Sequence, residues 1–216
     1  MIRHPSPNFG PRRGQARPEL VVLHFTEMRN AVSARDRLCS PQAEVSSHYL
    51  IGADGTLWQL VDEENRAWHA GAGSWRGRDD VNSRSIGIEL DNDGASPFPA
   101  PQMARLEGLL AQILPRWSIP PQGVIAHSDM APGRKVDPGP RFDWRRLARL
   151  GLALWPNESG DPTAPLADSL TRIGYPDAPE PIRLRAFRLR FRPQETGPED
   201  PRDRALASSL AKLSDV

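Results

Sequence analysis

Two apolar segments of this chain carry an ionisable side chain in mid-strand, and this pattern limits how the chain can fold. The segment "VVLHFT" (residues 21–26) holds His24, and "SIGIELD" (residues 85–91) holds Glu89, with Gly87 leaving open space on the same face. Side chains alternate between the two faces of a strand, so both ionisable groups point away from the most apolar face. A buried imidazole or carboxylate is costly unless it meets an ion, a base or a cleft. The sequence therefore predicts two strands whose polar faces border a functional site.

The stretch "HSDMAPGRKVDPG" (residues 127–139) adds more ionisable groups where prolines disfavour a helix or strand. His127 ends a short predicted strand. Lys135 and Asp137 are two residues apart, so both face the same way in an extended segment. Together with His24, this gives two imidazoles and one carboxylate, which leaves a fourth tetrahedral position for water. That is the composition of a catalytic zinc site, and we expect one Zn2+ per chain.

A zinc ion at these ligands would make hydroxide available at neutral pH, because it lowers the pKa of its bound water from about 15.7 to about 7. We expect Glu89 to take the water's proton and hand it to a leaving nitrogen. Lys135 is expected to stabilise the oxyanion on the attacked carbonyl. His48 and His69 are rival ligands that spacing does not exclude. Taken singly, a strand histidine, an Asp-Pro-Gly turn and a lysine also have purely structural interpretations.

The order of the segments indicates an α/β domain over residues 1–155 that begins with a polar arm. Strand-like runs alternate with a helix over residues 101–117, where apolar residues recur at helical spacing after a proline. Residues 156–164 predict a linker. Residues 165–216 predict a small domain of three short helices. Its middle segment, "PEPIRLRAFRLRF", also alternates like a strand, and we predict a helix there.

The composition excludes several classes of protein. The formal net charge is +1, so the overall charge does not indicate binding to nucleic acid or to a membrane surface. No run approaches the roughly 20 apolar residues of a membrane span. The single cysteine, Cys39, allows no intrachain disulfide and excludes a four-cysteine zinc site. With no leader-like segment, the sequence predicts a cytoplasmic protein, or a periplasmic one if a leader has been removed.

Five motifs, taken in order, resemble a known family: "VVLHFT", "SSHYLI", "WHAG", "NSRSIGIELDN" and "HSDMAPGRKVDPG". Over residues 5–155 the chain resembles the zinc-dependent N-acetylmuramoyl-L-alanine amidases of the amidase-2 type, and "SPNFGPR" is similar to the AmpD- and AmiD-like members. The resemblance implies a central mixed β-sheet flanked by helices, with the ligands and catalytic residues named above. It also implies hydrolysis of the amide bond between (1,6-anhydro-)N-acetylmuramic acid and L-alanine of the stem peptide.

Substrate contacts are expected from a further group of side chains. Aromatic faces suit the apolar faces of a sugar or peptide, and an arginine (Arg84 or Arg76) suits a diaminopimelate carboxylate. The backbone N–H of Ser128, next to the ligand His127, is expected to donate to the substrate. The family resemblance places His69 near the groove, as part of the pocket wall. The expected substrate-binding residues are Tyr49, His69, Trp75, Arg84 and Ser128.

The C-terminal residues 165–216 resemble, more weakly, the small three-helix peptidoglycan-binding-like domain of some family members. This part either packs against the catalytic domain as a cap or binds glycan or peptide. The arginines of "IRLRAFRLRFRP" either meet stem-peptide carboxylates or form a solvated face: Arg183, Arg185, Arg188, Arg190 and Arg192.

The complete set of ligands and catalytic groups favours an enzyme of peptidoglycan turnover and recycling. A non-catalytic module that binds or senses peptidoglycan fragments is the alternative, and a zinc peptidase that cuts elsewhere in the stem is a third interpretation. The expected partner is a muropeptide or peptidoglycan fragment as substrate. No nucleic acid and no membrane span are expected, and the chain is expected to be a monomer.

Overall fold

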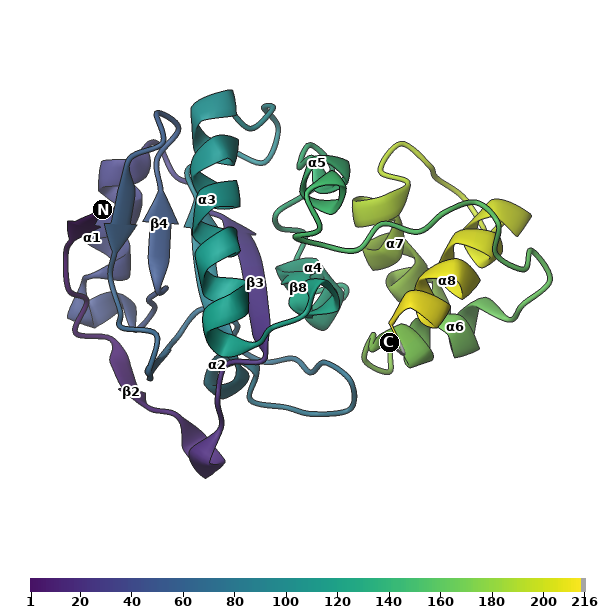
Figure 1. The fold of residues 1–216 in the computed structure, drawn as a ribbon, viewed down its shortest axis with the longest axis horizontal. Helices are drawn as coiled ribbons and strands as arrows, with labels where there is room; N and C mark the ends of the chain where they lie inside the picture. Colours follow the sequence, from purple (N-terminus) through teal and green to yellow (C-terminus); the bar gives the residue numbers. More distant parts are fainter. Residues whose placement is uncertain (215–216) are drawn as a thin grey trace.

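The computed structural model describes residues 1–214, and its centre is a six-stranded mixed sheet (Figure 1). The strand order is β1-β5-β4-β7-β3-β8. The central strands β4, β7, β3 and β8 run parallel, β5 is antiparallel to β4, and β1 adds to the edge. The strands are β1 Ile2–Arg3, β3 Leu20–Phe25, β4 Tyr49–Ile51, β5 Leu57–Gln59, β7 Ser85–Leu90 and β8 Val124–Ala126. The predicted α/β fold with a mixed sheet is confirmed.

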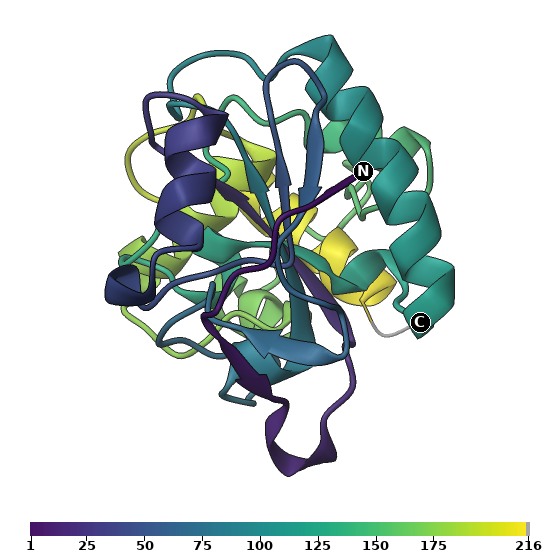
Figure 2. The same ribbon diagram turned by 90° about the vertical axis from the view of Figure 1, so that its left-hand side faces the viewer.

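Helices cover both faces of this sheet. Figure 2 shows the strands passing between α1 on one side and α3 on the other. The long helix α3 buries its apolar stripe against the alternate side chains of β3, β4 and β7 that face it, and α1 packs on the opposite face. The helices are α1 Ala31–Leu38, α2 Val81–Arg84, α3 Ala100–Trp117, α4 His127–Met130 and α5 Trp144–Arg149. The predicted helix over residues 101–117 is confirmed within one residue.

The N-terminal arm runs along the domain as short extended pieces. Strand β2 (Phe9–Pro11) pairs with β6 (Asn65–Ala67) in a separate two-stranded antiparallel sheet. The guanidinium of Arg12 donates to the backbone carbonyls of Glu63, Asn82, Ser83 and Ser85, which ties the arm to the segment that leads into β7. Satisfying four carbonyls with one side chain fixes the arm without a continuous sheet.

The C-terminal helical unit consists of α6 (Leu166–Ile173), α7 (Glu180–Phe191) and α8 (Pro201–Leu213), at one end of the molecule beside α4 and α5 (Figure 1). Its buried side chains join one apolar cluster with Leu20, Val22 and Ile125 of the sheet. The ambiguous middle segment is the helix α7, as predicted. The domain boundaries stay a prediction, and residues 215–216 of the expected C-terminal domain lie outside the described residues.

Both expectations for the arginines of α7 are wrong for most of them. Three of them are buried, so they neither form a solvated face nor are exposed to a substrate: Arg183, Arg188 and Arg190. Arg188 pairs with the buried Asp203 of α8, and Arg190 pairs with the buried Asp129 of α4. Their aliphatic parts alternate with apolar residues along the helix, which explains why the sequence pattern was ambiguous.

No helix within residues 1–214 is both long enough and apolar enough to cross a membrane.

Candidate metal centre

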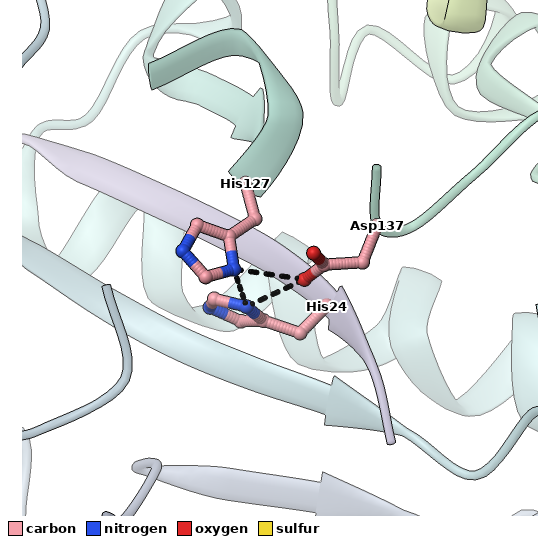
Figure 3. A group of neighbouring side chains, drawn as sticks. All are labelled: His24, His127 and Asp137. Carbon is pink, nitrogen blue, oxygen red and sulfur yellow. Dashed lines mark hydrogen bonds and ion pairs between the residues drawn. The ribbon is translucent and has the colours of Figure 1, made fainter. Parts of the chain in front are cut away.

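Three side chains from two distant parts of the chain meet at one point (Figure 3). His24 comes from β3, His127 opens the one-turn helix α4, and Asp137 lies in the loop that follows α4. His24 Nδ1 lies 2.9 Å from His127 Nδ1 and 3.0 Å from Asp137 Oδ2, and His127 Nδ1 lies 2.9 Å from that same oxygen. All three side chains are buried. The residues expected to bind metal therefore form a group that could hold an ion.

Contacts on the far side of each imidazole determine which nitrogen carries hydrogen. His127 Nε2 lies 2.9 Å from the carbonyl oxygen of Ala70, so Nε2 donates and Nδ1 keeps its lone pair. His24 Nε2 lies 3.0 Å from His69 Nδ1, and when it donates there, His24 Nδ1 also presents a lone pair to the centre. Two nitrogen lone pairs and a carboxylate oxygen then face one another at hydrogen-bond distance. These electron-rich atoms repel one another, and a cation bound between them would replace the repulsion by attraction.

Electrostatics keep the group in metal-binding protonation states. Burial, with the nearby charge of His127, lowers the pKa of His24 to about 4. With no metal bound, burial raises the pKa of Asp137, but the hydrogen bonds that Nδ1 of His127 and Nδ1 of His24 donate to it when they carry the hydrogen outweigh burial and hold that pKa below its ordinary value. At neutral pH, His24 is neutral and Asp137 is ionised, which are the forms in which these side chains bind metals.

The donor set fits a zinc ion. Zinc binds imidazole nitrogen and carboxylate oxygen at about 2.0–2.2 Å in a tetrahedron, which places ligand atoms roughly 3.3 Å apart. The observed separations of 2.9 to 3.0 Å need to widen only slightly to reach that spacing. Two imidazoles and one carboxylate also leave one position open, as in catalytic rather than structural zinc sites.

His69 lies behind His24 and does not join the trio. Its Nδ1 faces His24 Nε2, and its Nε2 lies 3.2 Å from Ser85 Oγ, whose hydroxyl donates to the carbonyl of Val81 at 2.6 Å. One consistent set of hydrogens satisfies this chain from ligand to backbone. Gly87 provides the space, because a Cβ there would lie 2.4 Å from Cγ of His69. The opening that the glycine was expected to leave is filled by this imidazole.

His48, the other rival ligand, is engaged within the sheet. Its Nδ1 accepts the backbone N–H of Gly87 at 2.9 Å, and its Nε2 donates to the carbonyl of Asn65 at 3.1 Å. Burial, assisted by the positive charge of Arg12, lowers the pKa of His48 to about 3. Both ring nitrogens are occupied by backbone groups, so neither is available to a metal.

Glu89 faces the same centre from β7. It is the register partner of His24 across the β3–β7 pair, and its Oε2 is buried without a hydrogen-bond partner within residues 1–214. Burial raises the pKa of Glu89 well above its ordinary value, the charge of Asp137 raises it further, and the charge of Lys135 opposes both. An unsatisfied buried polar group costs about 1–3 kcal/mol. This carboxylate is therefore held where it weakens the fold.

A cleft of about 380 Å3 opens over the centre. Lys135, Arg134 and Arg37 bring positive charge to its walls, and Trp68 with the α1 side chain Leu38 brings apolar surface. Its lining includes His24, His69, Glu89, His127, Lys135 and Asp137. A larger cavity, of about 920 Å3, lies between β5 and α3 and is lined by none of these six residues.

Three of the expected substrate-binding residues lie away from the cleft. Tyr49 is buried and its hydroxyl donates to Glu63 Oε1 at 2.6 Å. Trp75 packs edge-on against Tyr175 of the helical unit, with ring centroids 5.3 Å apart. Arg84 is buried and donates to the carbonyls of Trp75 and Arg78. Each residue stabilises the fold, and none of the three lines the cleft.

Ser128 also lies outside the lining of the cleft. Its backbone N–H donates to the carbonyl of Asp137 at 3.0 Å, so it is not free for a substrate. This bond instead ties the two ligand-bearing segments together, because Ser128 follows His127 directly. Of the expected substrate-binding group, only His69 borders the cleft.

The cleft also contains residues that sequence reasoning missed. Trp68 precedes His69 in "WHAG" and is partly exposed on the wall. Arg37 lies on the exposed side of α1, and among the described residues its guanidinium has no hydrogen-bond or ion-pair partner. The motif gave a signal for Trp68. Arg37 has no local signal, because only the packing of α1 beside the sheet brings it to this cleft.

Comparisons with known proteins agree with this geometry. The family model described as N-acetylmuramoyl-L-alanine amidase (Amidase_2) matches residues 14–140. The chain is 37% identical over 238 residues to the N-acetylmuramoyl-L-alanine amidase AmiD of Escherichia coli (strain K12), covering 92% of this chain and 85% of that protein. It is 32% identical over 165 residues to the 1,6-anhydro-N-acetylmuramyl-L-alanine amidase AmpD of Citrobacter freundii, covering 68% of this chain and 88% of that protein.

A solved structure gives the same result in three dimensions. The complex of E. coli AmiD with anhydro-N-acetylmuramic acid-L-Ala-D-gamma-Glu-L-Lys superposes with a TM-score of 0.83 at 34% sequence identity. The match covers 94% of this chain and 91% of that one, so the C-terminal helical unit is included.

Proposed function

Because the chain belongs to the Amidase_2 family of N-acetylmuramoyl-L-alanine amidases, we propose that it hydrolyses the amide bond between N-acetylmuramic acid and L-alanine of the stem peptide. The reaction serves peptidoglycan turnover and recycling. The observation that carries the proposal is the meeting of three metal-binding atoms, 2.9 to 3.0 Å apart, at the base of a cleft in a chain of this family.

The metal in this proposal is zinc, held by His24, His127 and Asp137. When bound, zinc would supply Lewis-acid activation of water and of the substrate carbonyl. The chain's own part is to hold two neutral imidazoles and a carboxylate in fixed orientation. The carbonyl of Ala70 orients His127, and His69 orients His24, as outer partners of metal ligands generally do.

Glu89 is the proposed general base and acid. Two observations support this role. The Oε2 of Glu89 is buried without a hydrogen-bond partner among the described residues, and Glu89 lies opposite His24 in the sheet. Its raised pKa brings the carboxyl closer to the operating pH, where a group can take a proton from water and then give it to the leaving nitrogen. A nearby cation would lower that pKa again by favouring the ionised form.

Lys135 is the proposed partner of the developing oxyanion. It lines the cleft beside Asp137, and its charge acts on Glu89 and on His24. An ammonium group at this place, in a site partly closed to water, stabilises negative charge on the attacked carbonyl oxygen.

The substrate class is a muropeptide, and the 1,6-anhydro form is the proposed preference. Support comes from the AmpD relative, named for 1,6-anhydro substrates, and from the ligand in the AmiD complex. That ligand contains a γ-linked glutamate, whose α-carboxylate is free. The guanidinium of Arg37, which has no ion-pair partner among residues 1–214, is suited to such a carboxylate, and Trp68 offers a flat face to the sugar.

The compartment and the oligomeric state are further parts of the proposal. A cytoplasmic, monomeric enzyme that acts on soluble turnover fragments agrees with the single free thiol of Cys39. Cell fractionation tests the compartment, with a periplasmic signal as the contradicting result. Light scattering tests the oligomeric state.

The decisive experiment incubates purified protein with 1,6-anhydro-N-acetylmuramyl tripeptide and follows free tripeptide by mass spectrometry. We expect release with zinc, none after chelation, and none from His24→Ala. A matched control is His48→Ala, which removes a buried histidine of the same sheet outside the trio and should still bind zinc. Binding of the muropeptide without cleavage by zinc-loaded protein would identify a sensing module. Release of a shorter peptide would identify a peptidase.

A further inference from the structure

The helix that carries His127 is anchored from the C-terminal helical unit. Asp129, two residues after His127, is fully buried in α4. Its Oδ1 accepts the hydroxyl of Tyr175 at 2.7 Å, and its Oδ2 accepts Arg190 Nη1 at 2.9 Å. Tyr175 follows α6 and Arg190 lies in α7, so both partners come from beyond residue 164. The charge of Asp129 is therefore balanced by a part of the chain outside the metal-binding domain.

The terminal nitrogens of the Arg190 guanidinium bond to the sheet domain, while its Nε is buried without a hydrogen-bond partner among the described residues. Its Nη1 also approaches the carbonyl of Val124 at 3.3 Å, and its Nη2 approaches the carbonyl of Leu154 at 3.3 Å. The guanidinium carbon lies 3.8 Å from the centre of the Trp144 ring. Desolvated cation–π contacts and ion pairs of this kind are strong, and they fix the orientation of a guanidinium. Arg190 thus acts as a buried connector from α7 to β8, α4 and α5.

Asp129 passes this anchoring to the metal ligand. Its Oδ2 also accepts the backbone N–H of Ala126 at 2.9 Å, which joins the two ends of the turn that starts at His127. A one-turn helix has too few internal hydrogen bonds to hold its own shape. If Asp129 lost its partners, its buried charge would be uncompensated and the carboxylate would turn away. The backbone at His127 would then lose the bond that fixes its direction.

We propose that the C-terminal helical unit is a positioning element of the metal centre, with Arg190 and Tyr175 orienting Asp129 and, through it, His127. The proposal rests on the metal site of the proposed function. It assigns the unit a role inside the enzyme and does not require the unit to contact glycan or peptide. Arg190, Tyr175 and Asp129 act as positioning residues, since none of them lines the cleft.

The chain offers a matched control on the same helix. Arg188 precedes Arg190 on α7, with only Leu189 between them. It is also buried and also pairs with a buried aspartate, Asp203. Its other bonds go to the carbonyls of Gly197 and Pro198, within the helical unit. Breaking this pair damages the unit but leaves α4 untouched.

The test measures zinc affinity by chelator competition, and the visible spectrum of the Co2+-loaded full-length protein, for Arg190→Gln and Arg188→Gln. We expect both variants to lower Tm. Only Arg190→Gln should weaken zinc binding, by about 10-fold or more, as loss of outer-shell support typically does, and only it should change the Co2+ spectrum. Equal affinities in the two variants, whether both wild-type or both reduced, would overturn the proposal.

Tyr175→Phe keeps the test open if Arg190→Gln does not fold. It removes one hydrogen bond to Asp129 and leaves the ion pair, so we expect a smaller loss of zinc affinity, about threefold. Wild-type affinity in Tyr175→Phe would count against the proposal. Because these readouts need no substrate, they separate the two claims. Wild-type protein that binds zinc but releases no peptide contradicts the proposed function only.

Discussion

His24 and Glu89 are register partners on the parallel strands β3 and β7, so a proposed metal ligand and the proposed base project from the same face of the sheet. Sheet pairing fixes this relationship without help from any loop. Functional groups on paired strands keep their separation better than groups on mobile segments. The cost is local, because the Oε2 of Glu89 is buried with no hydrogen-bond partner in the described part of the chain.

Glu89→Gln should remove activity and stabilise the metal-free protein. Loss of a general base typically costs about 10²–10⁴-fold in rate. In the metal-free fold, burial raises the pKa of Glu89 above its ordinary value of 4.5, so the folded state binds a proton that the unfolded state releases. Stability of the wild type therefore falls as pH rises above that value. The Tm advantage of Glu89→Gln should be absent below about pH 4.5 and grow toward neutral pH.

The check is a pair of Tm series in chelator, together with kcat in zinc. An unchanged kcat would remove Glu89 from the proposed chemistry. A Tm advantage that shrinks with rising pH would contradict its burial as a charged group.

Removal of the metal should destabilise the protein. Zinc bound only by the folded state adds RT ln(1 + [L]/Kd), or about 4 kcal/mol at 1,000 times Kd. For a chain of this size, each kcal/mol shifts Tm by about 2–4 °C. We therefore expect chelation to lower Tm by roughly 8–16 °C, and we expect His24→Ala to show no further loss on chelation. Differential scanning calorimetry with and without zinc measures both. Equal Tm values for wild type in the two conditions would argue against a metal bound at this place.

The sequence was informative where side-chain chemistry conflicts with its surroundings. A histidine and a glutamate inside apolar strands, and an acid in a proline-rich loop, led to the trio and to Glu89 because burial of such groups requires a reason. It was uninformative where tertiary packing decides. Trp75 and Arg84 are residue types that often contact substrates. In the structure, however, Trp75 packs on Tyr175, and Arg84 donates to backbone carbonyls. Arg190 looked solvated because its partner Asp129 is 61 residues away.

His69→Ala should weaken zinc binding without removing a ligand. The imidazole accepts from His24 Nε2 and so fixes the tautomer and the ring plane of His24. Loss of such a partner commonly lowers metal affinity by 10- to 100-fold, about 1.4–2.8 kcal/mol. His48→Ala is the matched control, since His48 is at least as buried and bonds only to backbone and to the arm. Chelator competition on both variants decides; similar losses of affinity would mean that His69 acts only through general stability.

Gly87→Ala should disturb the metal site through His69 alone. The backbone at Gly87 lies outside the left-handed region, so alanine is tolerated there by the main chain. The obstacle is the imidazole, because the new Cβ would fall 2.4 Å from Cγ of His69. Overpacking of this kind costs about 1–3 kcal/mol, and the displaced ring should release His24, with a loss of zinc affinity close to that of His69→Ala.

The double variant Gly87→Ala/His69→Ala isolates this steric link. With the imidazole removed, the added methyl group has room, so Gly87→Ala should cost almost nothing further in stability or in zinc affinity. Contacting residues commonly show interaction energies of about 0.5–3 kcal/mol in such a cycle. Thermal melts and chelator competition on the four proteins measure both quantities. Additive losses would mean that the methyl group acts elsewhere, for example on the hydrogen bond that the N–H of Gly87 donates to His48. They would contradict the claim that Gly87 provides the space for the His69 imidazole.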